Sequence, residues 1–133
     1  MIDHISIPVR DLAASTRFYE AALAPLGYSR MLEKPGTIGF GKKYPDFWLN
    51  ERPALNDAPN NGSHVCFRAS EKEMVDRFHA AALLAGGKSA GAPGLRPQYH
   101  ETYYAAFILD PDGNRIEAVT FLTSNPSPLQ GEG

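Results

Sequence analysis

The feature that most constrains this chain is an internal repeat with a spacing of sixty residues. Each copy starts with a short alternating segment that carries a histidine, and continues into an amphipathic segment that ends at glycine. A repeat of this kind indicates one structural unit used twice. We therefore expect two similar halves, each contributing a histidine to a common site. The matched residues are His4-Ile-Ser-Ile with His64-Val-Cys-Phe, Arg17-Phe18 with Arg77-Phe78, Ala21-Ala22-Leu23 with Ala81-Ala82-Leu83, and Gly27 with Gly87.

Periodicity and turn residues predict the same element order, βαβββ, in both halves, which makes an α+β domain over residues 1–122. Residues 88–102 are rich in glycine and proline and are predicted to form a loop. Residues 91–100 of this loop have no counterpart in the first half and are a candidate lid. Residues 52–61 are predicted to be a linker, and 123–133 a disordered tail. The first half (about 1–51) has predicted strands at 2–9, 28–33, 36–41 and 46–51, and a helix at 11–26. The second half (about 62–122) has predicted strands at 64–69, 103–109 and 115–122, and a helix from a Ser70–Glu73 capping box to residue 85.

Composition supports a single packed domain and gives no indication of binding to nucleic acid or to a membrane. The chain has 133 residues, is 43% hydrophobic and has a net charge of −2. This charge offers no basis for nucleic-acid or anionic-membrane binding, and no apolar run approaches the ~20 residues that span a bilayer. The single cysteine excludes an internal disulfide framework, and the N-terminus has no signal-peptide pattern. We therefore expect a cytoplasmic protein.

Three residues form a candidate metal site. His4 and His64 lie opposite the apolar faces of their strands, and Glu117 lies on the predicted closing strand between apolar neighbours. A buried carboxylate is costly without a partner, and a divalent cation would supply one. Two imidazoles and a carboxylate with open positions suit non-haem Fe(II), Mn, Co, Ni or Zn. Such a metal can chelate two adjacent substrate oxygens as a Lewis acid.

The element order and three motifs resemble the vicinal oxygen chelate superfamily, which includes glyoxalase I, extradiol dioxygenases, fosfomycin-resistance transferases and bleomycin-resistance proteins. The resemblance implies two βαβββ modules forming an open, curved, mixed sheet. It also implies that His4, His64 and Glu117 are metal ligands. The motifs are His4-Ile-Ser-Ile-Pro-Val-Arg-Asp-Leu, Ser63-His64-Val65 and Asp110-Pro-Asp-Gly-Asn-Arg-Ile-Glu117.

A fourth position stays open at this stage. Glyoxalase-like members carry a glutamate on the last strand of the first half, which can bind metal and move a proton. Matching Pro45-Asp46 to Pro111-Asp112 places Glu51 there, so Glu51 is a candidate catalytic residue beside Glu117. Matching Leu49 to Ile116 places Asn50 there instead.

A further group of residues is predicted to line the substrate pocket, although ordinary packing also explains each of them. Cys66 and Arg68 share a strand face with His64. Cys66 also fits a small packing residue, and Arg68 also fits the rim. The remaining candidates are Trp48, Tyr99, His100, Tyr103 and Tyr104.

The predicted function is that of a small metalloenzyme of the glyoxalase and dioxygenase type, which acts on a small oxygenated compound and forms a homodimer. The familiar extradiol dioxygenases use two such units and are about twice this length, which disfavours that class. Its chemistry would be that of a lyase, an isomerase or a dioxygenase. The alternative is a non-catalytic binding or sequestering protein of the bleomycin-resistance type. Metal content separates the two, because the fold alone does not choose a function.

Overall fold

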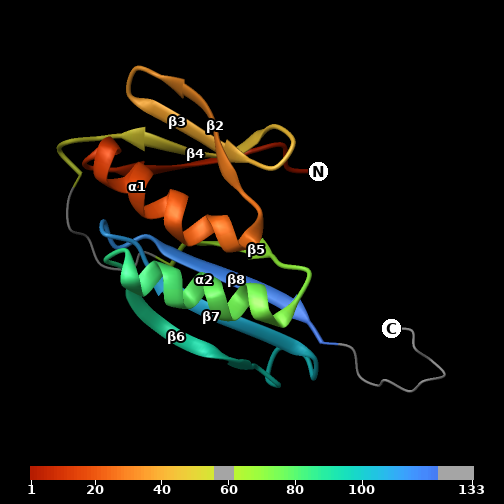
Figure 1. Ribbon diagram of the computed structural model, residues 1–133. Helices are drawn as coiled ribbons and strands as arrows, with labels where there is room; N and C mark the ends of the chain where they lie inside the picture. Colours follow the sequence, from red (N-terminus) through yellow and green to blue (C-terminus); the bar gives the residue numbers. More distant parts are fainter. Residues whose placement is uncertain (56–61, 123–133) are drawn as a thin grey trace.

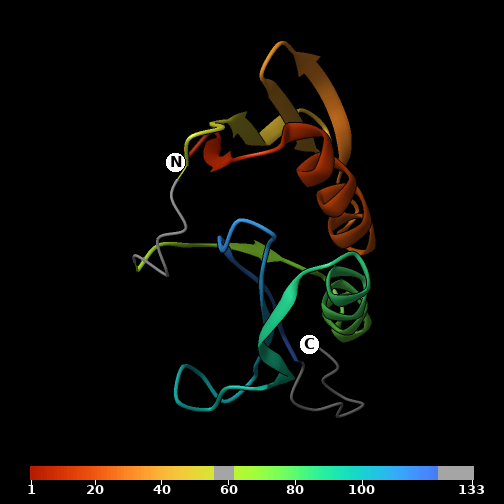
Figure 2. The ribbon, with the colours of Figure 1, turned by 90° about the vertical axis from the view of Figure 1, so that its left-hand side faces the viewer.

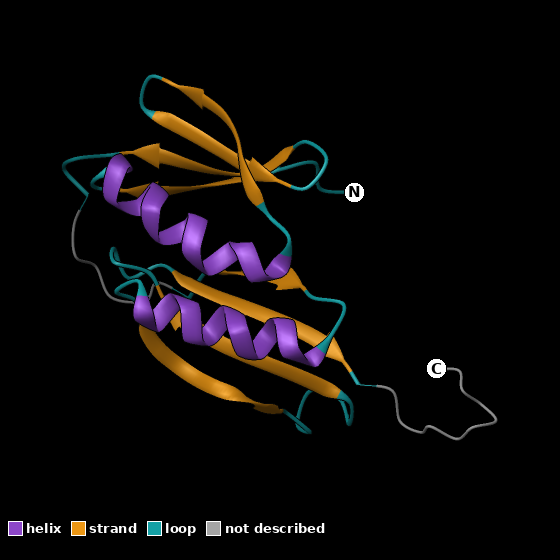
Figure 3. Ribbon diagram, viewed as in Figure 1, coloured by secondary structure: helices purple, strands orange, loops and turns teal. Residues whose placement is uncertain are grey.

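The chain folds as two βαβββ halves, each with one helix packed on a four-stranded mixed sheet (Figures 1 and 3). The computed structural model describes residues 1–55 and 62–122. The predicted linker falls partly, and the predicted tail wholly, outside these ranges. Within them, neither helix is long and apolar enough to cross a membrane. The predicted α+β class and element order are confirmed.

The first sheet has the strand order β1-β4-β3-β2, with β1 and β4 parallel and the other neighbours antiparallel. Helix α1 begins where the Asp11 side chain accepts a hydrogen bond from the Ala14 amide (3.0 Å). A short 3-10 turn follows the helix, and Gly27 ends it at φ +87°, a left-handed conformation that favours glycine. The elements are β1 (Ile5–Val9), α1 (Leu12–Leu23), the turn Ala24–Leu26, β2 (Ser29–Lys34), β3 (Thr37–Gly41) and β4 (Pro45–Glu51).

The second sheet repeats this arrangement in the order β5-β8-β7-β6. The predicted Ser70–Glu73 capping box is wrong. Helix α2 instead begins after Glu71, which makes no side-chain cap, and the Ser70 hydroxyl lies 3.3 Å from the sulfur of Met74. The elements are β5 (His64–Arg68), α2 (Lys72–Leu84), β6 (Lys88–Leu95), β7 (Tyr103–Leu109) and β8 (Arg115–Phe121).

The predicted loop at 88–102 is also wrong over its first half, because residues 88–95 pair with β7 as the edge strand β6. The register of β6 shifts twice, between Ser89 and Gly91 and between Gly91 and Gly94. Edge strands accommodate such bulges, glycines and Pro93 without breaking a central ladder. The candidate lid, predicted at 91–100, is thereby reduced to residues 96–100, within the connection between β6 and β7.

One apolar core joins the two halves. Figure 2 shows α1 and α2 side by side on the same side of the molecule, with the sheets extending away from them. Phe67 of β5 contacts rings of the first half edge to face, with centroids 5.1 Å from Phe47 and 5.1 Å from Tyr28. Packing of these rings buries apolar surface and adds edge-to-face aromatic interactions. The two sheets are therefore held at a fixed angle rather than loosely tethered.

The turn between β7 and β8 adds a polar connection to the first half. Asp110 is 4% exposed and accepts a 2.6 Å hydrogen bond from the Tyr19 hydroxyl of α1. Asp112 forms an ion pair with Arg10 (2.7 Å), and the Asn114 amide donates to the Pro8 carbonyl (3.0 Å). The predicted hairpin turn is thus also an inter-half contact that fixes β8 relative to β1.

Candidate functional site

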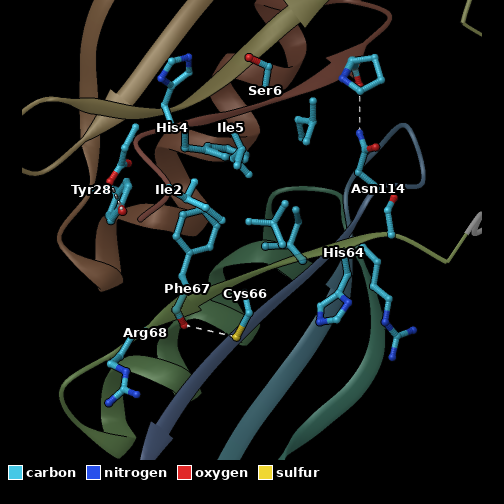
Figure 4. A pocket seen from close by; sticks show the side chains of 18 of the residues that line it. Ile2, His4, Ile5, Ser6, Tyr28, His64, Cys66, Phe67, Arg68 and Asn114 are labelled. Carbon is cyan, nitrogen blue, oxygen red and sulfur yellow. Dashed lines mark hydrogen bonds between the residues drawn. The ribbon is translucent and has the colours of Figure 1, made fainter.

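A cleft of about 640 Å³ lies between β1 and β5, the edge strands of the two sheets (Figure 4). Both repeated histidines line it, as the repeat predicted. The first half also contributes Ile2, Ser6, Tyr28 and Asp46, and the second half Cys66, Phe67, Arg68, Asn114 and Arg115.

The second half carries a hydrogen-bonded group built from three neighbouring strands. His64 of β5 lies with its Nε2 3.1 Å from Oε1 of Glu117 on β8. The Tyr103 hydroxyl of β7 donates to Oε2 of Glu117 at 2.6 Å. Glu117 is 2% exposed, so its carboxylate is buried and depends on these two partners. The structure thus brings together His64, Glu117 and Tyr103, three of the residues predicted from sequence.

Two side chains beside this carboxylate have raised pKa values. Burial, then the charge of Glu117, raises the pKa of Cys66 to about 12. Burial, followed by the hydrogen bond to Glu117, also raises the pKa of Tyr103. Both side chains are therefore neutral near pH 7. Cys66 therefore lines the site as a neutral thiol.

His4 does not join this group within one chain. Its Nδ1 lies 2.8 Å from Oδ1 of Asp3, and its side chain is 55% exposed. In Figure 4, His4 and His64 point in opposite directions from their strands. Over residues 1–55 and 62–122, no three histidine, cysteine or carboxylate side chains gather closely enough to hold a metal ion.

The strand register shows which first-half residue corresponds to Glu117. Cys66 pairs with Glu117, and the repeat equivalent of Cys66, Ser6, pairs with Trp48. Trp48 therefore occupies the corresponding position, which neither alignment considered from the sequence predicted. The two residues that those alignments did predict have other partners. Glu51 accepts a hydrogen bond from the Leu12 amide (3.1 Å) at the start of α1, and Asn50 accepts one from the Thr37 hydroxyl (2.7 Å).

The remaining predicted pocket residues divide between the two faces of the second sheet. Arg68 lies over Phe121 at 4.8 Å, and the same ring contacts His100 and Tyr103. Tyr99 contacts Tyr103, with ring centroids 5.1 Å apart. These residues form an aromatic rim at one end of the site. Tyr104, by contrast, donates a hydrogen bond to Asp76 of α2 (2.5 Å) and so lies on the helix side of the sheet.

Two basic residues near Glu117 were not predicted as site residues. The guanidinium carbon of Arg115 lies 4.7 Å from the centroid of Phe107, and that of Arg96 lies 5.5 Å from it. Phe107 is the cross-strand partner of Glu117. The alternation of β8 already places Arg115 on the face of Glu117. Arg96 follows a bulged strand in a glycine- and proline-rich stretch, where periodicity gives no signal.

Comparisons with known proteins agree with this architecture. A family profile described as the Glyoxalase/Bleomycin resistance protein/Dioxygenase superfamily matches residues 1–118. A search of curated proteins gives no match.

Solved structures with similar folds include a glyoxalase/bleomycin resistance protein from Albidiferax ferrireducens T118. It is 31% identical, the match covers 89% of this chain and 97% of that one, and the TM-score is 0.80. A family enzyme from Burkholderia phytofirmans PsJN is 21% identical, with 91% and 98% coverage and a TM-score of 0.72. The fosfomycin resistance protein FosX from Listeria monocytogenes is 18% identical, with 92% and 93% coverage and a TM-score of 0.67. For the last two structures, which are 21% and 18% identical, the likeness concerns the fold alone.

Proposed function

Because the chain belongs to the glyoxalase/bleomycin resistance protein/dioxygenase superfamily, we propose that it is a small, cytoplasmic, metal-dependent enzyme that acts on vicinal oxygens of a small organic compound. The reaction class is that of a lyase, an isomerase or a dioxygenase. The observation that carries the proposal is the pair formed by His64 and the buried Glu117, with donor atoms 3.1 Å apart.

This pair suits two positions of a metal site. Donor atoms that share one first-row cation, with bonds of about 2.0–2.2 Å, lie about 3 Å apart when they are adjacent ligands. A buried carboxylate beside an imidazole also has the chemistry that such cations prefer. The described residues of a single chain do not fit a site with three donors, since His4 points away from the pair.

A homodimer would bring a third donor to the His64–Glu117 pair. His4 is exposed, directly precedes the edge strand β1 and lines the cleft, so a second subunit can approach the His64–Glu117 pair with its own His4. We therefore assign His64 and Glu117 of one subunit and His4 of the other to each metal. Two equivalent sites then follow from two-fold symmetry.

Tyr103 and Glu117 have different roles beside the proposed metal. A divalent cation at this position would polarise adjacent substrate oxygens. The Tyr103 hydroxyl holds Glu117 Oε2 through its 2.6 Å hydrogen bond and so orients the carboxylate. Burial keeps Tyr103 protonated and makes it a weak acid, so it acts as a hydrogen-bond donor to Glu117, and the carboxylate is the group that we propose to move a proton.

The alternative is a non-catalytic protein that binds or sequesters a small molecule in the same cleft. The separation of His4 from the other two predicted ligands favours it, because a monomer would then lack a complete metal site.

Metal titration of the purified chain tests the proposal. We expect about one Mn²⁺, Co²⁺, Ni²⁺ or Zn²⁺ per subunit, and turnover of 2-oxoaldehyde adducts or catechols only in the loaded protein. His64→Ala should lose the metal. His79→Ala is the matched control, because His79 contacts Ser89 on the outer surface (2.8 Å). A dimer that binds none of these metals would instead support the sequestering protein.

A further inference from the structure

Two arginines lie against one aromatic ring beside the candidate metal ligands. The guanidinium carbons of Arg115 and Arg96 are 4.7 Å and 5.5 Å from the centroid of Phe107. The His64 ring is 6.3 Å from the same ring, and Phe107 opposes Glu117 across the β7–β8 ladder. Three basic side chains therefore surround the floor of the site next to its buried carboxylate.

The bulged strand β6 makes room for one of these arginines. The Arg96 guanidinium lies across β6 and donates to the carbonyls of Gly94 and Ala92, at 2.8 Å each. A Cβ on Gly91 would lie 3.0 Å from Arg96 Nη2 and 3.1 Å from Cδ1 of Phe107, and a Cβ on Gly94 would lie 3.3 Å from Arg96 Nη1. The absence of side chains at both glycines thus leaves room for the Arg96 guanidinium beside Phe107.

No carboxylate neutralises this pair within the described part of the chain. Neither Arg96 nor Arg115 has an ion pair there, and Arg115 has no hydrogen bond to another described residue. Glu117 is already bonded to His64 and Tyr103. The carboxylates on the opposite wall of the cleft, Asp3 and Asp46, are bonded to His4 and Tyr28. Both guanidiniums therefore keep a positive charge that an approaching anion can meet.

We propose that Arg96 and Arg115 form an oxyanion-binding subsite, which selects small organic acids that carry a carboxylate or a phosphoryl group. The guanidinium fork suits both kinds of oxyanion, and the aromatic floor holds the forks in place. The ligand's anionic group then lies beside Phe107, and its other end extends toward His64. The assignment rests on the proposed function only in taking this face as the ligand site.

Binding of two simple probes tests the subsite in the full-length protein at low ionic strength. Inorganic phosphate represents a tetrahedral oxyanion, and lactate a planar carboxylate with an adjacent hydroxyl. Arg115→Gln and Arg96→Gln should each weaken the tighter probe about tenfold or more, as expected for loss of a charge-assisted hydrogen bond. Arg77→Gln is the matched control, since Arg77 is exposed on α2, and it should change affinity less than about twofold. Which probe binds more tightly distinguishes a phosphoryl from a carboxylate preference.

One further variant and one treatment separate this inference from the metal proposal. Gly91→Ala displaces the Arg96 guanidinium without changing charge, so it should weaken probe binding while the circular dichroism spectrum stays that of the wild type. Wild-type protein treated with EDTA should lose the metal yet keep probe binding. The inference is overturned if neither probe binds the wild type, if Arg115→Gln and Arg96→Gln bind as the wild type does, or if EDTA treatment alone abolishes binding. In that last case the anion would be held by the metal.

Discussion

Replacing Asp110 by alanine is expected to lower the free energy of unfolding by about 3–4 kcal/mol, because several buried donors would lose their acceptor at once. The carboxylate accepts hydrogen bonds from the Tyr19 hydroxyl (2.6 Å), from the amides of Asp112 and Asn114 (2.8 Å each), and from the Asn114 side chain (2.9 Å). Guanidinium chloride unfolding followed by circular dichroism measures the loss.

Asp110→Asn is the matched control, because it keeps the shape and one acceptor oxygen, and it should lose clearly less stability than the alanine variant. The asparagine substitution also removes an ionisable carboxyl group. Burial raises the pKa of Asp110 above its ordinary 3.8, although hydrogen bonds from Tyr19 and Asn114 oppose the shift. The wild-type protein therefore loses stability as pH rises from about 3.8 through the raised pKa of the folded state, and the asparagine variant lacks this decline. A loss below about 1 kcal/mol in the alanine variant would show that the contact does not hold the halves together.

Replacing Glu117 by glutamine should weaken divalent-metal affinity by at least about 100-fold, because it removes a charged ligand. Isothermal titration with Zn²⁺ and Mn²⁺ measures the change. Tyr103→Phe should lose about tenfold, since it removes only the 2.6 Å hydrogen bond that orients the carboxylate.

Glu51→Gln is the matched control for this series. Glu51 accepts from the Leu12 amide at the start of α1, so its substitution should affect stability by about 1 kcal/mol and leave metal affinity unchanged. The reverse pattern, with metal lost in the Glu51 variant and kept in the Glu117 variant, would reinstate the glyoxalase-like alignment considered from the sequence.

The repeat and the local patterns were sufficient to predict the element order and most strand positions. Asp11 and Gly27 are local helix signals, and both mark the ends predicted for them. The stretch Lys88–Leu95 was mispredicted because its glycines and proline suggest a loop, while its pairing with β7 depends on residues distant in the chain. Long-range pairing overrode local preference at that edge.

The site, too, was only partly predictable from local sequence patterns. Alternation places His64, Glu117 and their neighbours on defined faces, and the structure brings these two residues together. Alternation gives no information on the angle between two sheets, so it does not reveal that His4 points away from His64. Likewise, the motif Asp110–Asn114 predicts a turn, whereas its bonds to Arg10 and Tyr19 depend on how the halves pack.

Metal binding by a mixed dimer tests the central claim most directly. His4→Ala subunits keep the His64–Glu117 pair, and Glu117→Gln subunits keep His4. Each variant alone should form dimers that bind almost no metal. Co-expression with two affinity tags isolates the heterodimer, which the account predicts to bind about one metal ion, since one of its two sites then has all three ligands. A heterodimer as empty as its parents, beside a wild-type dimer that binds metal, would contradict the assembly of the site from two subunits.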